Sequence, residues 1–314
     1  MRLSTRLLFL RLPQCFVDFR EHFANFGLEF KRSGPYEKIM RSEVKINPPF
    51  GYSEIQALNR HDLVRLYEAG EIPEFAAKSQ ILPLTFSEFL AASAQLPIVF
   101  IQSAGANQLM PVVMTGLGGQ QCLFAEKTGK KDAEKWHWDT QVYLPAYVRR
   151  HPFCMSAASS QAKEGDELLV CVEKSHLADK SSKHTLQVFD GDAPSERWQM
   201  IEQFLQSYQS DIELTRQFTE KLQSLDLFHS LEASIAPQAD AEPVSVTGMF
   251  GINEEKLNQL NDAELAGLSR NGYLPRIYVH LQSLQNFQKL LNRFQESQVK
   301  SIMAKPKTAK DMVN

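Results

Sequence analysis

The strongest local signal in this sequence is the stretch Leu84-Thr85-Phe86-Ser87-Glu88-Phe89. Thr85 and Glu88 have the spacing of a capping box, in which each side chain satisfies a free backbone N–H at the start of a helix. Leu84 and Phe89 have the spacing of a hydrophobic staple, which fixes the direction in which the chain approaches that helix. The stretch therefore predicts a helix over residues 86–95.

Short apolar runs after this helix predict an antiparallel meander. The run 97–101 (Pro-Ile-Val-Phe-Ile) is rich in β-branched and aromatic residues, as buried strands are. We expect a second strand over 110–115 and a third over 121–126, joined by a turn at the glycines of 116–119. The charged residues 127–136 indicate a loop.

Two further strands and then mainly helices are expected in the rest of the chain. Residues 166–173 and 185–189 have the composition of strands. Apolar residues at helical spacing then form two groups, Trp198, Ile201, Phe204, Leu205 and Tyr208, followed by Leu214, Phe218, Leu222 and Leu225.

Local signals also divide the C-terminal half. Residues 235–246 hold two prolines and no helical stripe, which predicts a linker. Asn253 and the pair Asn261/Glu264 are typical caps of two short helices, and a last helix is expected to begin near Tyr273. The sequence predicts an α+β fold, with an antiparallel sheet in the N-terminal half of the body and a mainly helical C-terminal half.

Composition excludes several classes of protein. The 314 residues carry a formal net charge of −3, and no apolar run is long enough for a transmembrane helix. Because residues 1–50 and 297–314 are basic, the body between them is acidic, which argues against a nucleic-acid partner. Four cysteines without a C-x-x-C pair predict neither a disulfide scaffold nor a zinc site, and we expect them to stay reduced in the cytoplasm.

The two ends of the chain differ from the body. Residues 1–50 form an expected N-terminal extension, for which Met40 is an alternative start. A signal peptide is a competing interpretation, although Arg11 interrupts the apolar run 7–10, and an amphipathic arm is another. Residues 297–314 are rich in lysine and predict a disordered tail, with binding to a membrane surface or an anionic partner as the alternative. The domain between these ends is expected to span residues 51–296.

The densest group of chemically capable residues lies between 136 and 153. Pro145 suits the first turn of a short helix, which His151-Pro152 must end, and adjacent arginines on such a helix point about 100° apart. The candidate ligand-binding residues are Trp138, Tyr143, Tyr147, Arg149, Arg150 and Glu173. They form either an anion site with aromatic walls or a structural ion pair between a buried Arg and Glu173 or Asp139. We expect the ion pair.

Other motifs assign no chemistry. His137 and His151 lack metal-ligand spacing, so neither a metal nor a cofactor is expected. There is no G-x-S-x-G element, and three of the cysteines, Cys122, Cys154 and Cys171, lie in or beside apolar runs, where Cys behaves as a small hydrophobe. We expect His280 to be a hydrogen-bonded, partly buried side chain of the last helix.

Taken in order, these elements resemble the bacterial SapC family, which is named for a protein of surface-layer systems. The most specific element is the run Tyr-x-Pro-Ala-x-x-Arg-Arg-x-Pro-Phe over residues 143–153. The other matching elements are 58–61, 82–84, 87–89, 96–100, 111–113, 116–117, Trp138, 170–173, 189–191, 253–257, 272–274 and 280–284. The resemblance covers about residues 55–294 and leaves out both ends of the chain.

The resemblance implies a lineage without a reaction. It favours an accessory or binding protein linked to a surface-layer or envelope-associated system, with an unidentified protein or small molecule as partner. The alternative is an enzyme or a small-anion-binding protein that uses the Arg and aromatic residues of 136–153. We expect a cytoplasmic location, with association with the cell surface as the alternative.

Overall fold

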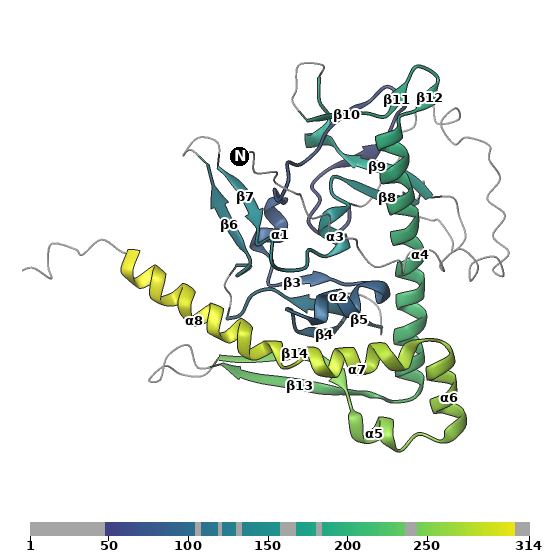
Figure 1. Ribbon diagram of the computed structural model, residues 1–314, viewed down its shortest axis with the longest axis vertical. Helices are drawn as coiled ribbons and strands as arrows, with labels where there is room; N and C mark the ends of the chain where they lie inside the picture. The colour runs from purple at the N-terminus through teal and green to yellow at the C-terminus, as the bar shows by residue number, and fades with distance from the viewer. Residues whose placement is uncertain are drawn as a thin grey trace, which may run out of the picture. The chain divides into compact units, whose positions relative to one another are not determined.

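A five-stranded antiparallel sheet organises the larger part of the molecule (Figure 1). The computed structural model describes residues 48–103, 108–118, 121–129, 134–157, 168–179, 184–235 and 244–304. Most of the predicted N-terminal extension, including Met40, and residues 305–314 of the predicted tail lie outside the described residues. The strand order in this sheet is β13-β14-β4-β5-β3.

The centre of the sheet is the predicted pair of strands. β4 (Ile98–Gln102) and β5 (Leu109–Met114) are antiparallel, with Ile98 opposite Val113, which confirms both strands of the prediction. The predicted third strand over 121–126 is correct only for its last two residues, which begin β6 (Ala125–Thr128). It does not pair with β5, because β3 (Ile81–Pro83) occupies that place. The backbone N–H groups of residues 115 and 116 donate to the Gln80 carbonyl and so extend the pairing of β3 with β5. The chain that follows passes across the end of the sheet.

Both ends of the charged segment 127–136 are strands and not the expected loop. β6 (Ala125–Thr128) pairs with β7 (Lys135–Trp138), with Lys127 opposite Trp136, in a separate two-stranded sheet. Lys127 places its ammonium 5.2 Å from the centroid of the Trp136 ring, so part of the charge is held against an aromatic surface. The short helix α1 (Glu74–Lys78) lies next to β7.

Both ends of the predicted linker 235–246 belong to the five-stranded sheet. β13 (Phe228–Ile235) and β14 (Val244–Ile252) form a hairpin, and Ile235 is opposite Val244. β14 also pairs with β4, with Met249 opposite Ile101. The residues between the two strands lie outside the described part of the chain.

A smaller three-stranded sheet carries the second group of strands. Its order is β1 (Ile55–Ala57), β9 (Leu168–Glu173) and β8 (Phe153–Ala157). Nearby, β2 (Leu63–Arg65) pairs with β10 (Thr185–Gln187), and β11 (Phe189–Asp190) pairs with β12 (Ala193–Pro194) across the turn at Gly191. The strands predicted over 166–173 and 185–189 are therefore confirmed where they are described.

One long helix connects the two sheets. α4 (Glu196–Ser224) contains both groups of apolar residues that the sequence places at helical spacing, except Leu225, which is the C-cap residue. In Figure 1, α4 runs past both sheets. Trp198 packs on Phe153 of the three-stranded sheet, while Phe218 packs on Phe100 of the five-stranded sheet and on Phe89 beside it. Because all of these side chains are fully buried, α4 fixes how the two sheets lie relative to each other.

The C-terminal helices confirm the caps and correct one boundary. The Asn253 side chain caps α5 (Glu254–Asn258), and a capping box starts α6 (Asp262–Arg270). The single last helix expected from Tyr273 is two helices, α7 (Tyr273–Ser283) and α8 (Asn286–Ala304). The Asn286 amide donates to backbone carbonyls of Ser93 and Leu96, which ties the break to the sheet side of the molecule.

The remaining C-terminal features concern α8 and His280. α8 continues to Ala304, so residues 297–304 are helical and the predicted disordered tail is wrong over that range. His280 is buried, as expected: Nδ1 donates to the Ile98 carbonyl and Nε2 accepts from the Ile252 N–H. Among the helices of the described residues, none combines the length and apolar character needed to cross a bilayer.

The capping box at Thr85 and Glu88 is confirmed and does more than start a helix. The chain makes a 3-10 turn (Phe86–Glu88) before α2 (Phe89–Ser93), which is shorter than predicted. Glu88 is only 5% exposed, and its Oε2 accepts from the N–H and hydroxyl of Thr85. Its Oε1 accepts from the Tyr143 hydroxyl at 2.9 Å and the Ala146 N–H at 2.6 Å. One carboxylate thus joins the start of α2 to the segment that carries the two arginines.

We predict that Glu88→Ala destabilises the protein by about 3 kcal/mol or more, because four donor groups, three of them buried, lose their acceptor. Asp211→Ala is the matched control, since Asp211 accepts from Ser87 at the same turn but in a more exposed position. We expect it to cost about 1 kcal/mol or less. Urea unfolding measures both, and equal losses would contradict the anchoring role of Glu88.

Candidate functional site

The helix predicted between Pro145 and Pro152 is present as α3 (Ala146–Arg149). The His151–Pro152 peptide bond that follows it is cis. α3 directs its two arginines apart, as expected. Arg149 is exposed, and its guanidinium donates to the Leu144 carbonyl and to the Tyr143 hydroxyl. Arg150 turns inward and is 7% exposed.

Arg150 is enclosed by tyrosine rings rather than by carboxylates. Its guanidinium carbon lies 4.3 Å from the ring centroid of Tyr147, 5.0 Å from that of Tyr208 and 5.5 Å from that of Tyr52. We call these three tyrosines the tyrosine cage. The faces of the rings carry partial negative charge, so they attract the cation. The Arg150 Nε is buried and has no hydrogen-bond partner among the described residues.

The expected ion pair of the buried arginine is therefore wrong. Among the ion pairs of the described residues none includes Arg150, and both of its predicted partners bind other groups. Asp139 accepts from Arg293 at 2.8 Å. Glu173 accepts from Ser53 and contacts His151. Each carboxylate has a nearer donor, and tyrosines from three separate segments occupy the space around the guanidinium.

Glu173 and His151 form a buried pair beside the cage. The distance from His151 Nε2 to Glu173 Oε2 is 2.5 Å, and the Ser53 hydroxyl donates to the other carboxylate oxygen at 2.7 Å. Burial raises the pKa of Glu173, but the hydrogen bonds from His151 and Ser53 outweigh it and lower the pKa to about 2. Glu173 is thus an ionised acceptor at neutral pH.

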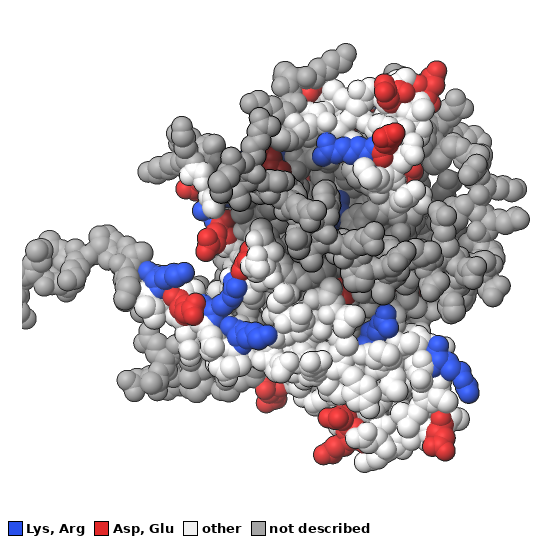
Figure 2. All heavy atoms as spheres, in the orientation of Figure 1, with Lys and Arg blue, Asp and Glu red and all other residues white. Residues whose placement is uncertain are grey.

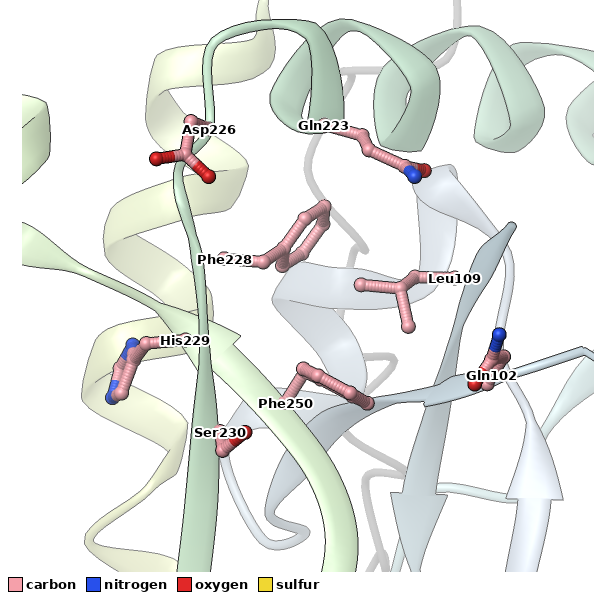
Figure 3. A pocket seen from close by; sticks show the side chains of 8 residues that line it. All are labelled: Gln102, Leu109, Gln223, Asp226, Phe228, His229, Ser230 and Phe250. Carbon is pink, nitrogen blue, oxygen red and sulfur yellow. The ribbon is translucent and has the colours of Figure 1, made fainter. Parts of the chain in front are cut away.

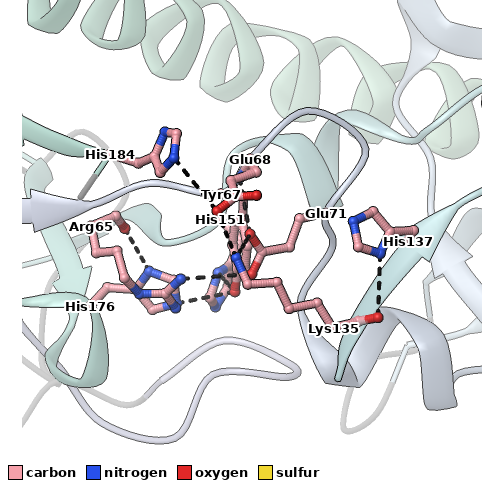
Figure 4. Close-up of polar contacts among 9 residues, drawn as sticks. All are labelled: Arg65, Tyr67, Glu68, Glu71, Lys135, His137, His151, His176 and His184. Carbon is pink, nitrogen blue, oxygen red and sulfur yellow. Dashed lines mark hydrogen bonds and ion pairs between the residues drawn. The ribbon is translucent and has the colours of Figure 1, made fainter. Parts of the chain in front are cut away.

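Tyr67 lies between two histidines (Figure 4). Its hydroxyl oxygen is 3.0 Å from His151 Nδ1 and 3.1 Å from His176 Nε2. His176 belongs to the 3-10 turn Lys174–His176, and its Nδ1 is 2.8 Å from the Arg65 carbonyl. A carbonyl only accepts, so Nδ1 carries the proton of the neutral ring and Nε2 is an acceptor. Burial lowers the pKa of His176 to about 4, in agreement with a neutral ring.

Neutral histidines satisfy this arrangement at neutral pH. Burial lowers the pKa of His151, with Glu173 acting in the opposite direction, so His151 is neutral and donates from Nε2 to Glu173. His176 Nε2 also lies 3.5 Å from Arg65 Nη2, which can only donate, so the Tyr67 hydroxyl proton can go to His151 Nδ1. Every ring nitrogen of the two histidines then has a hydrogen-bond partner while both rings are neutral.

The outer end of the network is a cluster of charged side chains (Figure 4). Lys135 contacts Glu68 at 2.9 Å and Glu71 at 3.1 Å. Arg65 lies 3.7 Å from Glu71, and its guanidinium carbon is 5.7 Å from the centroid of the Tyr67 ring. These opposite charges neutralise one another, and no basic surface results from the cluster.

Tyr52 joins the cage to the histidine network. Its ring centroid is 4.6 Å from that of His151, and the same ring is one wall around Arg150. Its hydroxyl donates to the Phe153 carbonyl at 2.6 Å. The cage and the network therefore form one continuous candidate site at the ends of α3, β8 and β9.

Comparison with known proteins identifies the lineage. The SapC family model matches residues 58–290, well over half of the chain. The chain belongs to the SapC family. Neither a search of curated proteins nor a search of solved structures gives a match. The matched region of this SapC-family chain contains Arg150, His151, Glu173 and Tyr208, whereas Tyr52 precedes it.

The structure separates the six predicted site residues. Tyr147 and Arg150 meet in the cage, and Glu173 lies in the adjoining network. Tyr143 and Arg149 contact each other on the more exposed side of α3. Trp138 lies elsewhere in the core, where its Nε1 donates to the Val142 carbonyl.

Sequence reasoning missed four participants of this site. Tyr52, Tyr67, His176 and Tyr208 come from separate segments, and none lies in a motif with informative spacing. Of these, Tyr208 did appear on the apolar face of a predicted helix, which is a signal for packing and not for a cation contact. His151 was considered only as a metal ligand. Within the described residues, no group of three or more His, Cys, Asp or Glu side chains is arranged to hold a metal ion.

A separate pocket of about 410 Å³ lies at the C-terminal end of α4 (Figure 3). Phe228, Phe250 and Leu109 form its apolar lining. Asp226 at its rim pairs with Lys256 at 2.5 Å, so the acidic group there is already neutralised. None of the predicted site residues lines this pocket.

The tyrosines and the arginine of the site keep their protons at neutral pH. Burial raises the pKa values of Tyr52 and Tyr67 above the ordinary range, so both keep their protons and neither is an activated nucleophile at neutral pH. Arg150 supplies a fixed positive charge. On the face drawn in Figure 2, basic and acidic side chains of the described residues are interspersed.

We predict that the free energy of unfolding falls as the pH is lowered from about 6.5 to 4. His151, His176 and His280 have lowered pKa values in the folded state, so the unfolded chain binds more protons in this window. Each histidine contributes a slope of at most about 1.4 kcal/mol per pH unit. Urea unfolding at a series of pH values should give a shallower slope for His176→Asn, with the exposed His61→Asn as the control. An unchanged slope in His176→Asn would contradict the prediction.

Proposed function

We propose that this SapC-family protein is an accessory binding protein that takes a small anionic group at Arg150. One observation carries the proposal: a buried guanidinium without a carboxylate partner among the described residues. Removing a cation from water costs several kcal/mol. Each ring of the tyrosine cage returns about 0.5–2 kcal/mol. An anion bound at Arg150 would offset the rest of this desolvation cost.

The chemistry of Arg150 selects the class of ligand. A guanidinium is planar and donates in parallel pairs, which suits a carboxylate or a phosphate group better than a spherical ion. The tyrosine cage adds apolar walls on which a planar or aliphatic part of the ligand can pack. The absence of an activated nucleophile among the described side chains of the site favours binding over catalysis.

We predict that phosphate or acetate raises the melting temperature of the protein relative to chloride at the same ionic strength. An anion at one hundred times its Kd stabilises by about 2.7 kcal/mol, which corresponds to roughly 5–10 °C for a domain of this size. The two anions separate a phosphate site from a carboxylate site. Arg150→Met removes the charge at similar length and should abolish the shift.

The exposed neighbour provides the control. Arg149→Met removes one arginine from the same helix and should keep the anion-dependent shift. If the wild-type protein shows no shift with either anion and Arg150→Met is at least as stable, then Arg150 is a structural cation and the proposal is wrong. If Arg150→Met fails to fold, the absence of a shift in the wild-type protein decides the same question.

The cellular setting of the proposal rests on the lineage. We propose that the protein serves a bacterial surface-layer or envelope-associated system and does so from the cytoplasm. The association of the family with surface layers supports the first part. The second part draws support from the sequence, in which four cysteines without a C-x-x-C pair predict thiols that stay reduced.

Cell fractionation tests the location. We expect most of the protein in the cytoplasmic fraction of its own host, with its thiols available to a maleimide reagent after denaturation. Recovery of most of the protein at the cell surface would overturn the cytoplasmic part and favour a direct role in the surface layer. A cytoplasmic and an outer-surface marker protein, followed in the same fractions, control for leakage.

A further inference from the structure

Two of the free cysteines face each other across the smaller sheet. Cys154 on β8 and Cys171 on β9 are register partners in an antiparallel pair, and both side chains are 0% exposed. They pack with Tyr52 on the face of the sheet opposite to Phe153 and Val172, since neighbouring residues of a strand point to opposite faces. Register partners on one face have adjacent side chains, so the two thiols form a pair.

The hydrogen-bond pattern shows how far apart their backbones are. The Glu173 N–H donates to the Pro152 carbonyl, and hydrogen-bonded pairs recur at every second position of an antiparallel ladder. Cys154 and Cys171 are two positions further on, so they form a hydrogen-bonded pair with Cα atoms about 5.5 Å apart. Disulfides span Cα separations of about 4.4–6.8 Å, so the backbone already permits a bond.

The surroundings distinguish the two sulfur atoms. The Cys171 thiol hydrogen-bonds to Cys154 and, together with the nearby Arg150 charge, lowers the pKa of Cys154 against the effect of burial. The same contact and burial raise the pKa of Cys171. β8 is also an edge strand of its sheet, so local opening exposes Cys154 more readily than a residue of the central strand β9.

We propose that Cys154 and Cys171 are a redox site that forms a reversible cross-strand disulfide with a peroxide as oxidant. This proposal does not depend on an anion at Arg150, because it follows from the register of β8 and β9. The proposed redox role gives a function to two cysteines that the sequence alone identifies as small hydrophobic residues.

The reaction balances with hydrogen peroxide. The Cys154 thiolate attacks one peroxide oxygen, the O–O bond breaks, and the departing hydroxide takes a proton to give water and a Cys154 sulfenic acid. The Cys171 sulfur then attacks the Cys154 sulfur, the S–O bond breaks, and the second oxygen leaves as water with the Cys171 proton. Two thiols are oxidised to one disulfide while one peroxide is reduced to two waters.

Geometry also predicts that the bond is easy to reduce. Cβ atoms of a hydrogen-bonded pair lie near the upper end of about 4.5–5.5 Å, whereas a disulfide needs about 3.5–4.5 Å. Bond formation must draw the strands together, which strains the product and makes it more oxidising than a structural disulfide. A small thiol as reductant therefore restores both cysteines by two exchange steps and is itself converted to its disulfide.

The test uses the folded full-length chain with Cys15→Ala and Cys122→Ala, which retains two of its four cysteines. Brief treatment with hydrogen peroxide should lower the thiol content, measured in denaturant, from two to zero, and dithiothreitol should return it to two. Trypsin cuts after Arg150, Lys163 and Lys174, so mass spectrometry should show peptides 151–163 and 164–174 linked with the loss of two hydrogen atoms.

Cys154→Ala and Cys171→Ala in the same background are the controls and should give no linked peptide. Retention of both thiols, or sulfinic acid on Cys154 with Cys171 unmodified, would show that the pair is an inert part of the core. Linked peptides that appear only after unfolding would also overturn the proposal. If the double-alanine background does not fold, the same peptide map on the wild-type chain gives the answer, since disulfides of Cys15 or Cys122 yield different peptides.

Discussion

The packing of α4 across two sheets is the constraint on which the rest of this structure depends. Trp198 near its start is buried against the three-stranded sheet, and Phe218 near its end is buried against the five-stranded sheet. A helix of 29 residues is rigid over this distance, so the two sheets cannot shift independently. Tyr208 lies between these two anchors, and it is one of the rings around Arg150. The candidate site thus lies where the hydrophobic cluster around Trp198 meets the hydrophobic cluster around Phe218.

The buried charged groups of this region are compensated in two different ways. Glu88 and Glu173 are both buried carboxylates with several donors, so their desolvation is compensated by hydrogen bonds. Arg150 has aromatic faces instead of a carboxylate, and its Nε has no partner among the described residues. Natural cores rarely leave a buried polar atom unsatisfied, which is why this arginine, and not the exposed Arg149, directs attention to ligand binding.

Membership of the SapC family gives this arrangement a lineage, and the structure gives it a physical description. Arg150, the histidine network and the cysteine pair all contact or adjoin Tyr52. The proposed anion site and the proposed redox site would therefore lie on either side of one tyrosine ring.

The features that could be predicted from the sequence are local. The caps at Thr85/Glu88, Asn253 and Asn261/Glu264 are correct because each hydrogen bond closes within three residues, and β4 and β5 are correct because their apolar composition suits a buried strand. The pairing of β3, and not of 121–126, with β5 and the separation of α7 from α8 depend on tertiary contacts. The same is true of the contacts of Arg150 with Tyr52 and Tyr208 in place of Glu173. Those partners lie tens to a hundred residues apart, and the competition among many distant groups for one buried space leaves no signature in local spacing.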